Sequence, residues 1–207
     1  MAEAAKRRGL DGIAITDHDC SLAENEAEMV SREVSILIIP GVEVTTASGH
    51  LLVLSPQSSF SPKSPFIEVA KRAIADGSVA IIPHPTDPFS HGVGAQLVRA
   101  LPFRMPLEAM NASTVRRYNR SASELAASLS LPMTAGSDAH MSIAVGDAFT
   151  VLEAQKRDVA SVLDAIKNGR TSAVGRQTPF STTLLGVLKK LYRHAKLENK
   201  KNTAELP

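Results

Sequence analysis

Short polar clusters that combine histidine with carboxylate residues lie at the ends of several apolar runs in this chain. Imidazole and carboxylate groups are ligands that zinc, manganese and iron favour in proteins. Because α/β folds place their chemistry at strand ends, the pattern predicts a multi-metal hydrolytic site. The clusters, which hold four of the six histidines, are Asp17-His18-Asp19, Glu43 with His50, His84, and Asp138 with His140.

The spacing of the candidate ligands favours two metal ions that lie close together and share a carboxylate ligand. Asp138 and His140 are two positions apart, so in an extended chain their side chains point the same way. A carboxylate such as Glu43 can bridge two cations, and two cations roughly 3.5–4 Å apart can clamp a phosphate and activate a water. Ordinary alternatives remain open: His18 as a capping group and His50 as an exposed turn residue.

The elements that position these clusters alternate along the chain. Short apolar runs predict strands and amphipathic runs predict helices, which is typical of an α/β fold with parallel sheet, open or closed. Pro40-Gly41 is predicted to stop a strand, and Ser21-Leu-Ala-Glu24 to cap a helix. About seven or eight strands in a chain of this length favour a compact, imperfect barrel. The nine strand-like runs from which these strands are expected span residues 12–16, 35–39, 42–45, 51–54, 79–82, 107–110, 132–135, 148–152 and 172–174. The predicted helices span residues 21–32, 65–75, 92–100, 119–129 and 156–168.

Composition excludes several classes of protein. A chain of 207 residues that is 43% hydrophobic can bury a core, and one domain with an appendage is the default. A single cysteine, Cys20, excludes an internal disulfide framework and, with no apolar run long enough to span a bilayer, favours a cytoplasmic location. The net charge of +2 predicts no strongly charged partner and argues against nucleic acid as one.

The chain divides by composition into residues 1–181, the predicted metallohydrolase domain, and residues 182–207. The second region predicts a basic amphipathic helix with a frayed end. Three alternatives remain open for its apolar stripe: packing on its own domain, a homo-oligomer contact, or attachment to a membrane surface or nucleic acid.

Five ordered motifs resemble the PHP (polymerase and histidinol phosphatase) superfamily. They are TDHD at 16–19, GVE at 41–43, a histidine before LLVL at 51–54, IPHP at 82–85 and GSDAH at 136–140. The resemblance covers about residues 1–175 and is closest to small stand-alone members. It implies a distorted seven-stranded βα barrel with up to three divalent ions of zinc, manganese or iron. It also implies hydrolysis of a phosphate ester, in a small phosphorylated metabolite or a nucleotide, by a metal-bridging hydroxide.

The resemblance also implies a role for each matching residue. Asp17 and Asp19 would not bind a metal themselves but would orient the His18 side chain. The implied ligands are Glu43 and Asp138 for the first metal, Glu43, His50 and His84 for the second, and His18 and His140 for the third.

Three further residues are candidates for substrate contact. Arg116 and Arg117 follow a predicted strand, and arginine suits bidentate binding of oxyanions. Asn111 ends that strand and could face the site. A solvated helix face for the arginines and a capping role for Asn111 are the ordinary alternatives.

The start of the chain departs from the family pattern. Family members begin with a strand that carries a His-x-His motif, whereas sixteen residues precede Asp17 here and none is histidine. We therefore expect the first strand to be missing, together with two ligands of the first metal and one of the third. Met1 would then be an internal methionine of a longer reading frame. The alternative is a genuinely shortened protein, a catalytically impaired metal-binding remnant with a binding or regulatory role.

Overall fold

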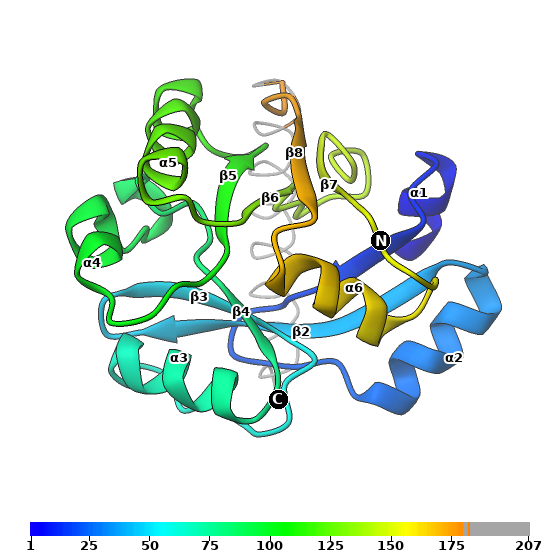
Figure 1. The fold of residues 1–207 in the computed structure, drawn as a ribbon. Helices are drawn as coiled ribbons and strands as arrows, with labels where there is room; N and C mark the ends of the chain where they lie inside the picture. The colour runs from blue at the N-terminus through cyan, green and yellow to red at the C-terminus, as the bar shows by residue number, and fades with distance from the viewer. Residues whose placement is uncertain (180–181, 183–207) are drawn as a thin grey trace, which may run out of the picture.

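The computed structural model describes residues 1–179 and Thr182 as alternating helices and strands, which confirms the predicted α/β class (Figure 1). The predicted helix at 182–207 lies outside the described residues. The elements are α1 (Ala2–Arg7), β1 (Gly12–Ile15), α2 (Glu24–Val34), β2 (Leu37–Thr46), β3 (Gly49–Leu54), α3 (Phe66–Ala75), β4 (Val79–Ile81), the 3-10 helix η1 (Pro88–Ser90), α4 (Gly94–Ala100), β5 (Leu107–Asn111), α5 (Arg116–Leu129), β6 (Met133–Gly136), β7 (Ala148–Leu152), α6 (Val159–Lys167) and β8 (Thr171–Gly175).

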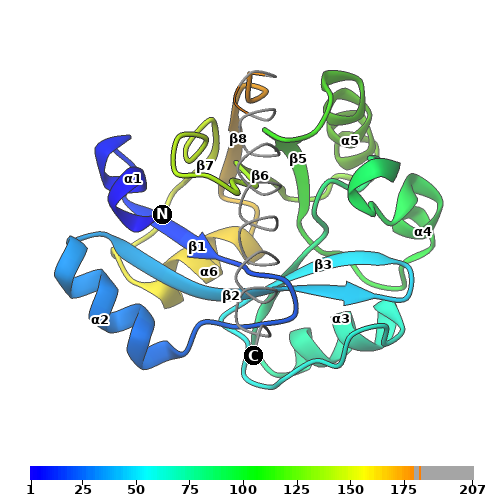
Figure 2. The same cartoon turned by 180° about the vertical axis from the view of Figure 1, so that it is seen from behind.

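The strands form one four-stranded sheet, in the order β1-β2-β3-β4, and two pairs, β5-β6 and β7-β8. The β1-β2 and β5-β6 pairs are parallel, and the other pairs are antiparallel. An isolated parallel bridge between Ile82 and Leu107 connects the end of β4 to β5. No continuous ladder closes a barrel within residues 1–179, and β1 is an edge of the first sheet (Figure 2). The seven-stranded barrel therefore stays a prediction.

Strand β2 continues through Pro40 and Gly41, where the sequence predicted a stop. Pro40 pairs with Ile15, the last residue of β1, and its carbonyl accepts the main-chain N–H of Ser55. Pro40 has no N–H to donate, but it lies at the point where the pairing of β2 with β1 ends and its pairing with β3 begins. The strand can therefore continue through the proline. A Cβ at Gly41 would lie 2.8 Å from Cγ2 of Thr16, so the close approach of β2 to Thr16 favours glycine at this position.

The predicted capping box before α2 is wrong. The helix begins at Glu24, with Ala23 in the N-cap position and no side-chain cap, and the Ser21 hydroxyl donates to the Leu22 carbonyl instead. Main-chain hydrogen bonds hold Asp17 and Asp19 against β2, so the chain has to leave the sheet before a helix can start.

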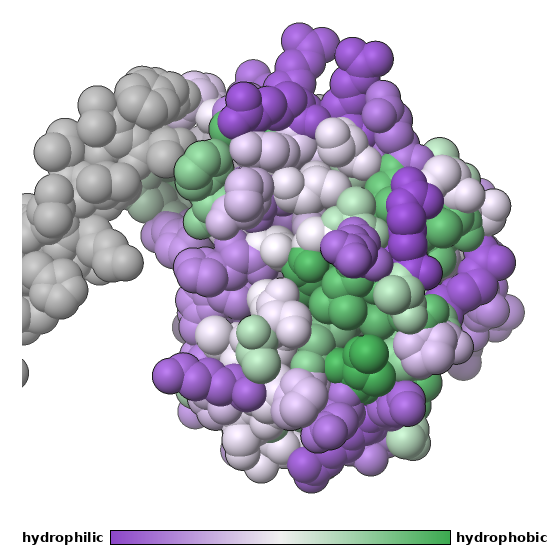
Figure 3. Space-filling model, turned by 90° about the vertical axis from the view of Figure 1, so that its left-hand side faces the viewer, coloured by the Kyte–Doolittle hydropathy of each residue, from purple (hydrophilic) through white to green (hydrophobic). Residues whose placement is uncertain are grey.

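Buried aliphatic side chains form the core beneath these strands. The largest cluster joins α3 and α5 to β2, β3 and β5, and it includes the fully buried Val44, Leu51 and Ile82. The face that carries α3 and α4 also shows a hydrophobic patch bordered by hydrophilic residues (Figure 3). No helix within the described residues is long and apolar enough to cross a membrane. His50 on β3 and His84 in the loop after β4 are therefore held beside packed core residues.

Candidate metal centre

Three histidines converge on the carboxylate of Glu43. Nδ1 of His50 and Nε2 of His84 lie 2.8 Å and 3.2 Å from Oε1 of Glu43. Nδ1 of His18 lies 3.8 Å from the other oxygen, Oε2. Glu43, His50 and His84 are buried, whereas His18 is exposed. The structure therefore brings together four residues that the sequence assigned to metal binding, from the β1–α2 loop, β2, β3 and the loop after β4.

Main-chain pairing places His18 beside Glu43. The two residues form an isolated parallel bridge beyond the end of β1. The N–H of Glu43 donates to the carbonyl of Asp17, and the N–H of Asp19 donates to the carbonyl of Glu43. The carboxylate of Asp19 accepts the N–H of Thr45 at 2.8 Å. Within the described residues, Asp17 and Asp19 thus fix the main chain on either side of His18, and neither side chain makes a hydrogen bond to its ring.

The charges in this cluster support one another. Burial opposes ionisation of Glu43, but hydrogen bonding and electrostatic attraction from His50 and His84 outweigh it and lower its pKa to about 2. Burial likewise opposes protonation of His84, and the carboxylates of Glu43, Glu108 and Asp138 outweigh that effect and raise its pKa. The cluster is therefore built to hold positive charge beside an ionised carboxylate.

A divalent cation fits the donor atoms of this cluster. Ligand atoms of His18, Glu43 and His50 all lie within 4.8 Å of one another. Within the described residues, Nδ1 of His50 is buried and makes no well-aligned hydrogen bond, although it lies 2.8 Å from Oε1 of Glu43. An unsatisfied buried nitrogen costs free energy that coordination to a cation would recover. Imidazole nitrogens with one carboxylate are ligands suited to zinc, manganese or iron.

A second group of polar residues lies at the ends of β5 and β6. The side-chain amide of Asn111 lies 2.9 Å from Oε2 of Glu108 and 3.4 Å from Oδ2 of Asp138. Nδ1 of His140 lies 3.7 Å from Oδ1 of Asp138, and the His140 side chain is 74% exposed. His84 and Asp138 both have positive φ angles, +30° and +46°, a strained conformation that is common at functional sites.

The sequence analysis missed one residue of the site, Glu108. It is buried within β5, and burial raises its pKa to about 7 although His84 and Asn111 act against this. A carboxylate inside a mainly apolar strand was the available signal. The glycine-rich sequence around His91 favours a solvated position, and the residue is exposed, but its ring also stacks on His50 with centroids 5.1 Å apart and its carbonyl accepts the His50 N–H.

The two candidate arginines begin α5. Arg116 and Arg117 line a groove of about 1160 Å³ whose other wall includes residues of β8. The guanidinium of Arg117 lies 4.6 Å from the ring centroid of Tyr118 and donates to its hydroxyl. Of the three substrate candidates, Asn111 alone makes a hydrogen bond to a predicted metal ligand within the described residues. The role of the arginines stays a prediction.

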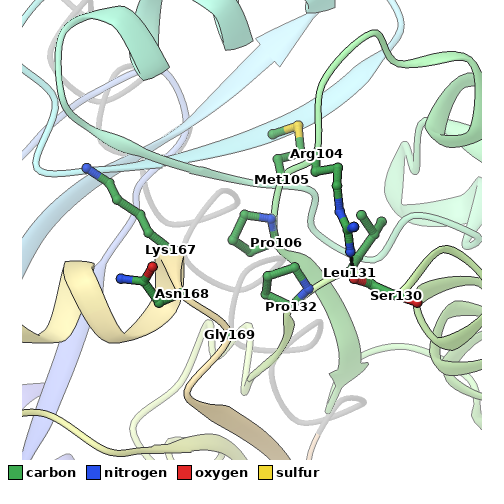
Figure 4. A pocket seen from close by; sticks show the side chains of 9 residues that line it. All are labelled: Arg104, Met105, Pro106, Ser130, Leu131, Pro132, Lys167, Asn168 and Gly169. Atoms are coloured by element: carbon green, nitrogen blue, oxygen red, sulfur yellow. Dashed lines mark hydrogen bonds between the residues drawn. The ribbon is translucent and has the colours of Figure 1, made fainter.

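A further pocket lies at the opposite end of β5 and β6 from Asn111 and Asp138. Its volume is about 470 Å³ (Figure 4). Pro106 and Pro132, which precede the two strands, form its floor, and Lys167 from the end of α6 borders it. None of the predicted metal ligands lines either pocket.

Part of the sequence and the overall fold are similar to those of known proteins. Residues 116–171 match the PHP-associated family model. An uncharacterized protein of Methanocaldococcus jannaschii is 25% identical over 97 residues, which cover 47% of this chain and 57% of that protein. The fold is similar to a two-domain protein of Bacteroides vulgatus that contains a predicted PHP-like metal-dependent phosphoesterase, with a TM-score of 0.65 and 20% identity over 84% of this chain and 59% of that one. It is also similar to PsfC from Pseudomonas syringae, with a TM-score of 0.64 and 20% identity over 94% of this chain and 87% of that one.

The family match and the shared fold together indicate the class of protein. Residues 116–171 are similar to the PHP-associated family, and the chain shares its fold with a protein that contains a predicted PHP-like metal-dependent phosphoesterase. It spans little more than half the length of the archaeal relative and of the Bacteroides protein. The activities of those longer proteins therefore enter only as proposals.

Proposed function

We propose that this chain is a metal-dependent phosphoesterase that hydrolyses the phosphate ester of a small phosphorylated metabolite or a nucleotide. The observation that carries the proposal is the convergence of His18, His50 and His84 on the buried carboxylate of Glu43. The Bacteroides vulgatus protein of similar fold is described as containing a predicted PHP-like metal-dependent phosphoesterase, which supports the same reaction class.

The residues of the cluster have distinct roles in this proposal. Glu43, His50 and His84 hold one ion, Asp138 joins Glu43 on a second, and His18 with His140 serves a third. Glu43 is ionised at neutral pH because its pKa is about 2, so it binds a cation without first releasing a proton. Divalent ions, when bound, supply Lewis-acid stabilisation of the phosphate and activate water. Asn111 steadies Asp138, and Arg116 and Arg117 are the candidates for contact with substrate phosphate.

Metal content tests this proposal directly. We expect the wild-type protein, after growth with zinc, manganese and iron, to carry bound metal by elemental mass spectrometry and to hydrolyse members of a phosphate-ester panel. Glu43→Gln removes the charge on which the histidines converge, so we expect at least a tenfold loss of metal affinity and no measurable turnover.

Glu124→Gln is the matched control. Glu124 is exposed on α5 and pairs with Arg120, so its substitution should leave both readouts unchanged. A wild-type protein without bound metal, or a Glu43→Gln variant with wild-type affinity, would contradict the proposal.

A metal-binding remnant with a binding or regulatory role is the second candidate. It is favoured by one observation: within the described residues, only His18, Glu43 and His50 form a group whose ligand atoms all lie within 4.8 Å of one another. One tightly bound ion per chain without turnover on any phosphate ester would favour this second function. Two or three ions with turnover would exclude it.

A further inference from the structure

We propose that Glu108 is a positioning residue that holds His84 and Asp138 in the conformation needed to bind metal ions. The inference deepens the proposed function and rests on it. Glu108 itself contacts neither the Glu43 carboxylate nor, in this proposal, the ions. It acts through the main chain of one ligand residue and through the side chain that steadies another.

The carboxylate of Glu108 connects the ends of two strands. Its Oε2 accepts the main-chain N–H of His84 at 3.0 Å and the side-chain amide of Asn111 at 2.9 Å. The main-chain N–H of Glu108 donates to the carbonyl of Ile82 at 2.9 Å. The main chain of Glu108 is therefore bonded to Ile82 and its side chain to His84, both in the segment after β4. The same side-chain oxygen, Oε2, also accepts from Asn111 at the end of β5.

The hydrogen bond to His84 stabilises a strained residue. His84 has a φ of +30°, and such a conformation is unfavourable unless the surrounding structure holds it. A hydrogen bond from its N–H to a carboxylate is stronger than one between neutral groups. This conformation directs Nε2 of His84 to within 3.2 Å of Glu43. Loss of the carboxylate would let the loop relax and move that nitrogen.

The path to Asp138 runs through Asn111. The amide that donates to Glu108 also lies 3.4 Å from Oδ2 of Asp138. The carbonyl oxygen of the Asn111 side chain accepts the N–H of Ser113, and the Ser113 hydroxyl donates to the main-chain carbonyl of Asp138. Asp138 also has a positive φ, +46°. The orientation of Asn111, set by Glu108, therefore determines the support that Asp138 receives.

Strand β6 leaves space for the carboxylate of Glu108. A Cβ at Gly136, the last residue of β6, would lie 2.5 Å from Oε1 of Glu108. Gly136 pairs with Asn111 in the β5-β6 ladder, so its missing side chain leaves the space that Glu108 fills. Glu108 is thus enclosed by the ends of β4, β5 and β6.

The charge of Glu108 also points to the metal site. The residue is 5% exposed, and within the described residues no lysine or arginine forms an ion pair with it. An ionised carboxylate that is buried without a cation destabilises the fold. Its two N–H donors offset part of this cost. Cations bound by His84 and Asp138 would supply the remaining compensation.

Glu108→Gln tests the inference, because glutamine keeps the size of the side chain and removes its charge. We expect zinc and manganese affinities, measured by calorimetry on the full chain, to fall about 10–100-fold, the range typical for residues that support metal ligands. The melting temperature of the metal-free variant should stay equal to that of the wild type or rise, since a buried charge is removed. A merely structural role would lower the melting temperature and leave metal affinity unchanged.

Asp147→Asn is the matched control. Asp147 is also 5% exposed, but its carboxylate accepts the Thr178 hydroxyl and pairs with Arg8 and Arg176. We expect its substitution to lower the melting temperature and to leave metal affinity unchanged. Gly136→Ala provides a second variant, because it presses on Glu108 without altering a ligand, and we expect it to weaken metal binding in the same direction.

The outcomes separate the inference from the function on which it rests. Wild-type metal affinity in both Glu108→Gln and Gly136→Ala overturns the positioning role and leaves the proposed function intact. A wild-type protein that binds neither ion overturns both. Weakened metal binding in these two variants, with the affinity of Asp147→Asn unchanged, supports the inference.

Discussion

Two buried carboxylates, Glu43 and Glu108, govern the site at the scale of single residues, and their surroundings shift them in opposite directions. Glu43 faces three histidines, and its pKa is lowered to about 2. Glu108 has N–H donors but no ion pair among the described residues, and burial raises its pKa to about 7. The same side-chain chemistry therefore gives a permanent anion in one place and, in the metal-free protein, a group that titrates near neutrality in the other.

These shifts predict how the stability of the metal-free protein depends on pH. The pKa of Glu108 rises from 4.5 to about 7 on folding, so the folded state binds a proton at this residue more tightly than the unfolded state does. The resulting contribution to the free energy of unfolding is complete below pH 4.5. It is lost as the pH rises to 7, by about 1.4 kcal/mol per pH unit. The lowered pKa of Glu43 acts the other way, and stability is lost as the pH falls from 4.5 towards 2. We therefore expect a maximum of stability near pH 4.5–5.

Scanning calorimetry of the chelator-treated protein between pH 3 and 8 measures this profile. Glu108→Gln should flatten the decline above pH 4.5, whereas the exposed control Glu124→Gln should retain it. An equal decline in wild type and Glu108→Gln would contradict the assignment of this effect to Glu108.

The turn between β2 and β3 sets the position of His50 at the scale of elements. Gly49 has a φ of +132°, and a Cβ at this position would lie 2.5 Å from the carbonyl oxygen of His91. That carbonyl accepts the main-chain N–H of His50 and holds the loop of η1 against β3. Glycine is therefore required here both for its backbone conformation and for the close approach of the two segments.

Two glycine substitutions separate these requirements. Gly49→Ala should lower the free energy of unfolding by more than 2 kcal/mol, about 1 kcal/mol for the backbone conformation and the rest for the contact with His91. Gly77 also has a positive φ, +83°, but a Cβ there would lie in open space, so Gly77→Ala should cost only about 1 kcal/mol. Urea denaturation of both variants measures the difference, and equal losses would show that contact with His91 has no energetic weight.

The candidate ligands connect distant parts of the chain at the scale of the whole molecule. Glu43 lies within β2, and His18, His84 and Asp138 lie just after β1, β4 and β6, so the ligands come from both the β1–β4 and the β5–β6 sheets. A ligand that binds only the folded state stabilises it by mass action. We expect zinc or manganese at about 100 times its dissociation constant to raise the free energy of unfolding by about 2.7 kcal/mol.

Thermal unfolding with and without metal checks this expectation. The melting temperature should rise with added zinc or manganese and return after a chelator is added. Magnesium at the same concentration is a suitable control, because it prefers oxygen ligands to imidazole. A melting temperature that does not respond to zinc or manganese would argue against a shared ion at this site.

The sequence by itself determined the order and type of most elements and most of the candidate ligands. Apolar periodicity placed β1, β3, β6, β7 and β8 within a few residues, because side-chain burial imposes that pattern locally. It also indicated His18, Glu43, His50 and His84, since polar residues at strand ends stand out against apolar runs.

Only the tertiary structure decided how these elements join and which other residues complete the site. The continuation of β2 through Pro40 depends on a change of partner strand, which no local pattern encodes. Glu108 and His91 enter the site because β5 and the η1 loop pack beside β4 and β3. Such contacts depend on residues far apart in the chain, so their energies are set by packing and not by local propensity.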